Sequence, residues 1–224
     1  ARVAGVPITG DIDIFSKVVD APIIGVTGSN GKSTVVALLA EIFRKAGKRY
    51  ALGGNLDGAN FKPALDLLDE DKKDFYILEL SSFQLETTES LNAEVAVLLN
   101  LSEDHMDRYS SLEEYHQAKQ RIFKGCKQIV INRDDSYSNP ASELEVPKWD
   151  FGFSRPGING FGLLEDGGEQ YLAYHFDKIV SVNELKVFGQ HNISNVLAAI
   201  ALAMSVGIDI KPIKKAITEF TGLP

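Results

Sequence analysis

The segment Thr27–Thr34 combines residue types that could bind a triphosphate. It reads Thr-Gly-Ser-Asn-Gly-Lys-Ser-Thr. Gly28 and Gly31 would allow backbone N–H groups to converge on phosphate oxygens, and the start of a following helix would add a positive dipole. Lys32 could reach the β- and γ-phosphates, and the Ser33 hydroxyl would be placed to bind Mg²⁺. We therefore predict a nucleotide-binding loop here.

The spacing of this loop departs from the common pattern G-x-x-x-x-G-K-[ST]. In that pattern the first glycine would fall at position 26, which is Val26 in this chain. A turn that only connects a strand to a helix is the alternative, but the Lys-Ser pair in this setting favours a phosphate site. The predicted nucleotide-binding residues of the loop are Gly28, Ser29, Asn30, Gly31, Lys32, Ser33 and Thr34.

Glu79 is an acidic residue at the end of an otherwise apolar run, Phe75–Leu80. If the run is a parallel strand, its carboxyl end faces the usual ligand crevice of an α/β sheet. A carboxylate there could bind Mg²⁺ beside a triphosphate. The alternative is an acid that is simply exposed at a strand end.

The segment Asn100–Arg108 follows a second apolar run, Val95–Leu99, and is rich in charged residues. His105 in this segment could be a metal ligand or a structural histidine, and the sequence alone does not favour either. Asp104 and Asp107 could orient loops or cap a helix as well as contact a ligand.

Lys119 lies on the apolar stripe of a predicted helix over residues 111–123, four residues after Tyr115 and three before Ile122. Its stem could pack on the apolar face while its ammonium reaches water. The alternative is a functional lysine near the phosphate site.

Further on, Asn192 and Asn195 share one face at the start of a predicted helix. Their amides suit an adenine or ribose edge, although Asn192 could merely cap the helix.

Elements of alternating type must position these residues. Short β-branched runs at 23–27, 49–52, 75–80, 95–99 and 128–131 read as buried strands because both of their faces are apolar. Helices are predicted at about 33–46, 64–68, 111–123, 192–206 and 211–220. This alternation indicates an α/β fold, a mostly parallel sheet flanked by helices with a phosphate loop.

Two regions break the alternation. Residues 149–188 are rich in glycine and aromatic residues with short alternating pieces, so we expect a small antiparallel β insertion beside the main sheet. Residues 1–20 read as a lead-in from a preceding domain, and residues 21–224 as one domain.

Composition limits the possible partners. The 224 residues include 23 Lys+Arg and 31 Asp+Glu, a net charge of −8. An acidic chain is a poor partner for nucleic acid or an anionic membrane, so phosphate must be held by a local site. The single Cys126 and the lack of a long apolar run or secretion signal fit a cytoplasmic protein. We expect a monomer.

In their order along the chain these motifs resemble those of the Mur ligases, the ATP-dependent amide-bond ligases of bacterial cell-wall synthesis. The resemblance covers about residues 5–224. It rests on the loop 27–34, the turn Gly53-Gly54-Asn55, Glu79, the segment 100–107, Lys119 and His191-Asn192-x-x-Asn195. The stretch 78–86 (LELSSFQLE) resembles the family member that adds D-glutamate.

The resemblance implies a role for each matching residue. It implies phosphate binding by Lys32, and one Mg²⁺ held by Ser33 and Glu79. It implies a second Mg²⁺ held by His105 together with Lys119, which would carry a carbamate. Contacts to the adenosine are implied for Asn192 and Asn195, and contacts to the muramoyl substrate for Asn55 and Ser81.

The resemblance also implies three domains, of which this chain matches the central ATPase domain. The C-terminal domain, with an arginine that helps bind ATP, would be absent, so we expect the chain alone to be inactive. The implied substrates of the whole enzyme are UDP-N-acetylmuramoyl-L-alanine and D-glutamate, joined through an acyl phosphate. A folylpolyglutamate synthase-type ligase and a nucleotide-binding module without turnover are the alternatives. The stretch Ser81-Ser82-Phe83-Gln84 argues against the first.

Overall fold

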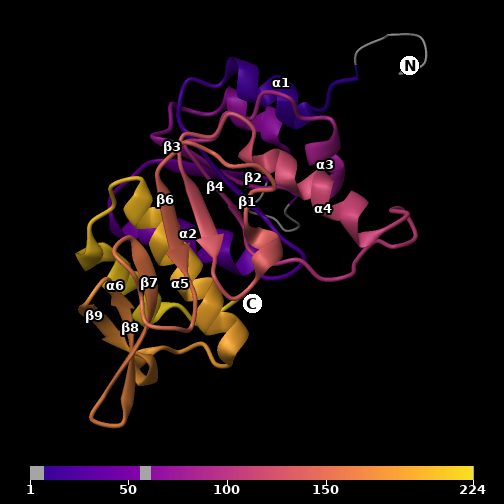
Figure 1. The fold of residues 1–224 in the computed structure, drawn as a ribbon. Helices are drawn as coiled ribbons and strands as arrows, with labels where there is room; N and C mark the ends of the chain where they lie inside the picture. The colour runs from indigo at the N-terminus through magenta and orange to yellow at the C-terminus, as the bar shows by residue number, and fades with distance from the viewer. Residues whose placement is uncertain (1–7, 56–61, 224) are drawn as a thin grey trace.

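A computed structural model describes residues 8–55 and 62–223, which form one nine-stranded sheet with helices on both faces (Figure 1). The strand order is β2-β3-β1-β4-β5-β6-β7-β8-β9. The predicted α/β class is confirmed. The strands are β1 (Ile23–Thr27), β2 (Tyr50–Gly54), β3 (Phe75–Glu79), β4 (Val95–Leu98), β5 (Ile129–Asn132), β6 (Lys148–Phe151), β7 (Gly160–Asp166), β8 (Glu169–Tyr174) and β9 (Asp177–Ser181).

The sheet is parallel from β2 to β7, and β1 lies between β3 and β4. Side chains of strands β1 to β5 alternate between two apolar cores. In β1, Ile24 and Val26 join the core on one face, while Ile23 joins the core on the other. Because both faces are covered, all five residues of β1 are buried, and the strand shows no polar alternation.

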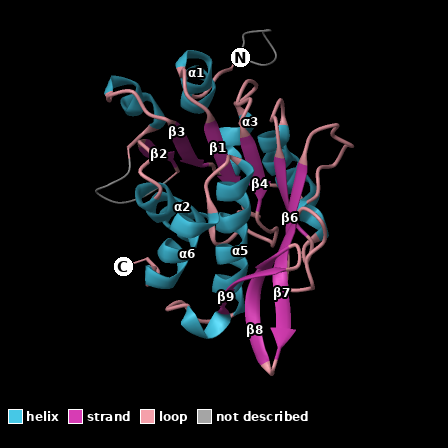
Figure 2. Cartoon of the chain, turned by 90° about the vertical axis from the view of Figure 1, so that its left-hand side faces the viewer, coloured by secondary structure: helices cyan, strands magenta, loops and turns pink. Residues whose placement is uncertain are grey.

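The helices are divided between the two faces. One core includes residues of α2 (Lys32–Lys45), α5 (Gln190–Ser205) and α6 (Ile210–Glu219), and Figure 2 shows these three helices side by side. The other core includes residues of α1 (Asp11–Val18) and α3 (Ser82–Glu86), with α4 (Leu112–Gln120) packed against α3. Short 3₁₀ turns cover Ala64–Asp69, Arg121–Phe123, Ser136–Ser138 and Val182–Glu184.

Local sequence explains where these helices begin and end. Helix α2 follows Gly31, whose φ of +85° lies in the left-handed region, and it ends before Gly47 at φ +67°. Helix α5 is apolar on every side over Val196–Ala203, because it lies between the sheet and its neighbouring helices. Within the described part of the chain, no helix has the length and hydrophobicity that a bilayer span requires.

The C-terminal part of the sheet differs from the prediction in one respect. The antiparallel portion is confirmed, but it does not begin at Trp149 and is not a separate layer. Trp149 lies in β6, which pairs in parallel with β5, and antiparallel pairing begins only between β7 and β8. Alternation of apolar and polar residues indicates that one face of a strand is exposed. It does not indicate whether the neighbouring strand runs parallel or antiparallel.

The N-terminal region also differs from the prediction. Residues 1–7 of the predicted lead-in lie outside the described residues. Residues 11–18 form helix α1, in which Ile12 and Phe15 are fully buried and Ile14 is exposed. Ile12 and Phe15, three residues apart, therefore lie on one buried face of this helix. Helix α3 was not predicted, because five residues are too few for a helical period to be visible.

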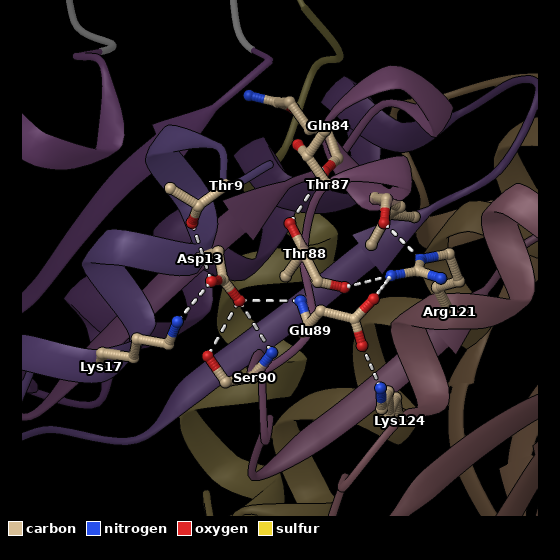
Figure 3. A network of polar contacts seen from close by, with 11 residues as sticks. Thr9, Asp13, Lys17, Gln84, Thr87, Thr88, Glu89, Ser90, Arg121 and Lys124 are labelled. Carbon is tan, nitrogen blue, oxygen red and sulfur yellow. Dashed lines mark hydrogen bonds and ion pairs between the residues drawn. The ribbon is translucent and has the colours of Figure 1, made fainter. Parts of the chain in front are cut away.

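A buried carboxylate fastens α1 to the segment after α3 (Figure 3). Asp13 accepts hydrogen bonds from the backbone N–H groups of Glu89 (2.7 Å) and Ser90 (2.9 Å). It also accepts from Thr9, from the Ser90 hydroxyl and from Lys17, whose ammonium is 2.6 Å away. Each carboxylate oxygen of Asp13 thus accepts hydrogen bonds from the protein. These bonds offset the free-energy cost of burying the negative charge.

These hydrogen bonds determine the pKa of Asp13. Burial alone would raise the pKa, but the donors on Lys17, Glu89, Thr9 and Ser90 together hold it well below its ordinary value of 3.8. A carboxylate with a lowered folded pKa stabilises the fold at every pH above its unfolded pKa. That stabilisation is lost as the pH falls below 3.8 towards the folded value.

We predict that Asp13→Ala lowers the free energy of unfolding by about 2–4 kcal/mol at neutral pH, because two backbone N–H groups lose their buried acceptor. Urea unfolding between pH 7 and pH 3 measures this loss, and the difference from the unmodified chain should shrink at the acidic end. Asp11→Ala on the same helix is the control, and it should cost less than 1 kcal/mol. Equal losses for the two variants would contradict this role of Asp13.

Candidate active site

The carboxyl ends of β1, β3 and β4 meet at one edge of the sheet, and the predicted site residues follow them. The phosphate loop joins β1 to α2, while Glu79 ends β3 and the segment 100–108 follows β4. The loop after β1 and the loop after β4 leave adjacent strands whose connecting helices lie on different faces. Such a position is the usual ligand site of an open α/β sheet.

Lys32 lies at the first position of α2 and turns back over the loop. Its ammonium donates to the carbonyl oxygens of Gly28 (3.0 Å) and Ser29 (3.1 Å). The positive charge therefore lies at the start of a helix, where the dipole also favours an anion. Phosphate binding by Lys32 stays a prediction.

Ser33 and Glu79 are 46 residues apart in the sequence and are in contact. The Ser33 hydroxyl donates to a carboxylate oxygen of Glu79 at 2.8 Å. The Glu79 residue is only 2% exposed, so the acid is not simply exposed at a strand end. Oxygen ligands with one carboxylate suit Mg²⁺, which completes its shell with phosphate oxygens and water. The residues present therefore fit one magnesium site.

The two predicted substrate residues flank Glu79. The Asn55 N–H donates to the Glu79 carbonyl at 2.8 Å, and the Asn55 side chain is exposed. The preceding residue must be glycine, because a Cβ on Gly54 would lie 2.0 Å from that carbonyl oxygen. Ser81 caps α3 by accepting from the Gln84 N–H at 3.2 Å. Their roles in substrate binding stay predictions.

Lys119 lies inside the protein and is 2% exposed, so its ammonium does not reach water at the surface. The ammonium donates to the Gly28 carbonyl at 2.9 Å and lies 3.5 Å from the Thr27 hydroxyl. It also lies 4.7 Å from the centre of the Tyr115 ring. Burial, and then the nearby charge of Lys32, lower the pKa of Lys119 to about 7. The alternative in which the Lys119 ammonium reaches water is therefore wrong, and the functional role of Lys119 stays a prediction.

His105 lies in the exposed part of the segment after β4, with φ at +55°. Its ring is 5.0 Å from Phe83 and 6.2 Å from Tyr115, the ring that Lys119 also contacts. The backbone N–H of His105 donates to the Asp104 carboxylate at 2.9 Å, so Asp104 orients this turn. Among the described residues no three His, Cys, Asp or Glu side chains form a metal cluster. The second Mg²⁺ site stays a prediction.

Asn192 and Asn195 face the phosphate loop across a cavity of about 500 Å³. Helix α5 begins at Gln190, so Asn192 is not its cap, and its amide donates instead to the Phe188 carbonyl at 2.8 Å. Asn195 packs so closely on the loop that a Cβ on Gly31 would lie 2.3 Å from its Oδ1. Besides these residues, the cavity is lined by Asn30, Thr34, Asn100, His191 and Ser194.

The sequence prediction missed Asn100 and Ser102, which join the phosphate loop to the segment after β4. Ser29 is 7% exposed, and its hydroxyl accepts from the Ser102 N–H and donates to the Ser102 carbonyl, both at 3.0 Å. Asn100 makes two hydrogen bonds to the backbone of Asn30. The available signal was an amide directly after a buried strand, but only the pairing of β1 with β4 reveals its partner.

This fold and site define a nucleotide-binding α/β domain with a phosphate loop. The Mur ligase middle domain model matches residues 26–203 of the chain. The chain belongs to the Mur ligase family.

Relatives and solved structures agree with this assignment. UDP-N-acetylmuramoylalanine–D-glutamate ligase of Pseudomonas savastanoi is 53% identical over 100% of this chain and 49% of its own length. The protein of the same name from Pseudomonas aeruginosa is 51% identical over the same shares. A structure of UDP-N-acetylmuramoyl-L-alanyl-D-glutamate–2,6-diaminopimelate ligase has a TM-score of 0.74 and 28% identity, over 91% of this chain and 47% of that one. The chain spans about half the length of its curated relatives.

We predict that Lys32→Ala abolishes ATP binding, because the variant loses the charge at the start of α2. Isothermal titration with ATP and MgCl₂ measures the affinity, which should fall by at least 100-fold. The control is Lys48→Ala, an exposed lysine after the other end of α2, and it should bind ATP like the unmodified chain. Unchanged affinity in Lys32→Ala would contradict the assignment of the phosphate loop.

Proposed function

We propose that this chain is the ATP-binding part of a ligase that adds D-glutamate to UDP-N-acetylmuramoyl-L-alanine in peptidoglycan precursor synthesis. The observation that carries the proposal is the contact between Ser33 and Glu79 beside Lys32, at the edge where a nucleotide binds an α/β sheet. The names of the relatives supply the substrates of the proposed reaction.

In the proposed reaction a carboxylate oxygen of the first substrate attacks the γ-phosphorus of ATP, and ADP leaves. The amine of D-glutamate then attacks the acyl carbon, an amide bond forms, inorganic phosphate leaves and the amine loses a proton. The carboxylate and the triphosphate repel each other, so the first step needs concentrated positive charge. Lys32 and the N-terminus of α2 provide part of that charge from this chain.

The remaining residues would bind and orient the reactants. Ser33 and Glu79 would hold a Mg²⁺ ion, which would neutralise charge on the phosphates. Asn192 and Asn195 would contact the adenosine across the cavity described above. Asn55, which the backbone of Glu79 holds next to the magnesium ligands, would contact the muramoyl substrate, and Ser81 lies two residues beyond Glu79.

We also propose that Lys119 carries a carbamate in the active enzyme. The neutral amine would attack carbon dioxide, form an N–C bond and lose one proton, leaving a carboxylate-like group. Lys119 supports this proposal because it is buried and lies beside both the Gly28 carbonyl and the Tyr115 ring. The new oxygens, with His105, would provide ligands for a second Mg²⁺.

Other features of the whole protein belong to this proposal. The family and relatives do not favour the folylpolyglutamate synthase alternative. A nucleotide-binding module without turnover is the second candidate for this chain by itself, because it spans about half of each curated relative. A cytoplasmic location and a monomeric state stay predictions.

Phosphate release measures the proposed function directly. In the full-length gene product, release from ATP should require both UDP-N-acetylmuramoyl-L-alanine and D-glutamate, and omission of either substrate should reduce the rate to background. With this chain alone, titration should show ATP binding without stimulated release. Release that depends on a folate and L-glutamate instead, or no ATP binding by either protein, would contradict the proposal.

We predict that Lys119→Ala in the full-length gene product lowers kcat by at least 100-fold, and that short carboxylic acids partly restore it by replacing the lost oxygens. Phosphate release with and without millimolar acetate or propionate measures the rescue. The exposed Lys127→Ala is the control and should show neither effect. Full activity of Lys119→Ala without additive would contradict the carbamate proposal.

A further inference from the structure

The carboxamide of Asn100 is bonded to the phosphate loop in the way that one strand residue pairs with another. Its Oδ1 accepts from the Asn30 N–H at 2.9 Å, and its Nδ2 donates to the Asn30 carbonyl at 3.0 Å. Both backbone polar groups of Asn30 are therefore held by one side chain, although Asn30 itself is exposed. The Asn100 carboxamide thus takes the place of a neighbouring peptide group as the hydrogen-bond partner of the Asn30 backbone.

Asn100 is itself held by its surroundings. Its carbonyl accepts from the Ser29 N–H at 3.0 Å. On the preceding residue, the Leu99 carbonyl accepts from the buried Asn132 amide at 2.8 Å. On the following residue, the Leu101 N–H donates to the Asp135 carboxylate at 2.8 Å. The backbone on both sides of Asn100 is thus fixed by partners outside the phosphate loop.

The two hydrogen bonds orient the peptide groups before and after Asn30. In a trans peptide the N–H and the C=O point in opposite directions. Because the Asn30 N–H faces Asn100, the Ser29 carbonyl must face away from Asn100, and it does so by accepting from Lys32. Because the Asn30 carbonyl also faces Asn100, the Gly31 N–H at the start of α2 is turned to the opposite side.

The segment after β4 is also bonded to the phosphate loop through a loop side chain. The Ser29 hydroxyl bonds both backbone polar groups of Ser102 in that segment. The Asn100 side chain thus bonds from the segment to the loop, and the side chains of Ser29 and Asn30 bond from the loop to Ser102. His105, which we predicted to bind the second metal together with Lys119, lies three residues after Ser102. The loop and this segment are joined as one unit.

We propose that Asn100 is a positioning residue for nucleotide binding, which orients the peptide groups around Asn30 so that the loop presents its N–H groups to the phosphates. This inference rests on the proposed function, because it assumes that the loop binds ATP. Asn100 lines the nucleotide cavity, but its effect acts through the loop backbone and not through a contact with the base.

Titration of the chain with ATP and MgCl₂, and separately with adenosine, tests this role. Asn100→Ala should weaken ATP binding by at least tenfold and leave adenosine binding within threefold of the unmodified chain. The ¹⁵N-labelled Gly31 amide supplies a spectroscopic signature. Its resonance should move when ATP is added to the unmodified chain, and it should move much less in the variant.

Asn132→Ala is the matched control, because Asn132 supports the same segment without contacting the loop. It should lower the melting temperature but keep ATP affinity within threefold. Asn100→Asp keeps the size of the side chain and its acceptor for the Asn30 N–H. Should Asn100→Ala not fold, Asn100→Asp replaces it, with the same tenfold loss expected because the carboxylate cannot donate to the Asn30 carbonyl.

The possible outcomes separate this inference from the proposed function. If neither the unmodified chain nor the full-length gene product binds ATP, the proposed function fails. If the chain binds ATP and Lys32→Ala does not, but Asn100→Ala and Asn100→Asp bind within threefold, only the role of Asn100 fails. That role also fails if Asn132→Ala loses ATP affinity as strongly as the Asn100 variant, since Asn100 would then only stabilise the segment.

Discussion

The site depends on hydrogen bonds that hold the phosphate loop before any anion arrives. The Gly28 carbonyl accepts from two ammonium groups, on Lys32 and Lys119, and the loop beyond it is bonded to the segment after β4. Peptide groups carry only partial charges, so they attract phosphate well only when several point the same way. Fixing those directions in advance avoids an entropic cost on binding.

This arrangement explains how a chain with a net charge of −8 can offer a phosphate site. The positive potential is local, since the Lys32 ammonium and the start of α2 meet at one loop. The buried Glu79 beside them would provide negative charge for the proposed Mg²⁺ ion. Charges separated by more than about 10 Å are largely screened in salt, so the acidic surface elsewhere has little influence on the loop.

Sequence patterns predicted the fold class and the loop because both depend on local properties. Runs such as Ile23–Thr27 are apolar at every position, as strands buried on both faces must be. The loop needs a lysine, a hydroxyl and two glycines within a few residues, and such a group is visible in one dimension. Helix α1 and the direction of β6 were not visible, because apolar spacing in short segments fits more than one structure.

By itself the sequence determined which residues can carry charge, bind oxygen or bend the backbone. These include Lys32, Ser33, Glu79 and Lys119. Only the tertiary structure decided which of them meet, because contacts between residues 46 or 91 positions apart depend on strand order, and no local pattern encodes that order. The placement of β1 between β3 and β4 brings Glu79 to Ser33 and Asn100 to Asn30. The polar residues therefore lie together in one site.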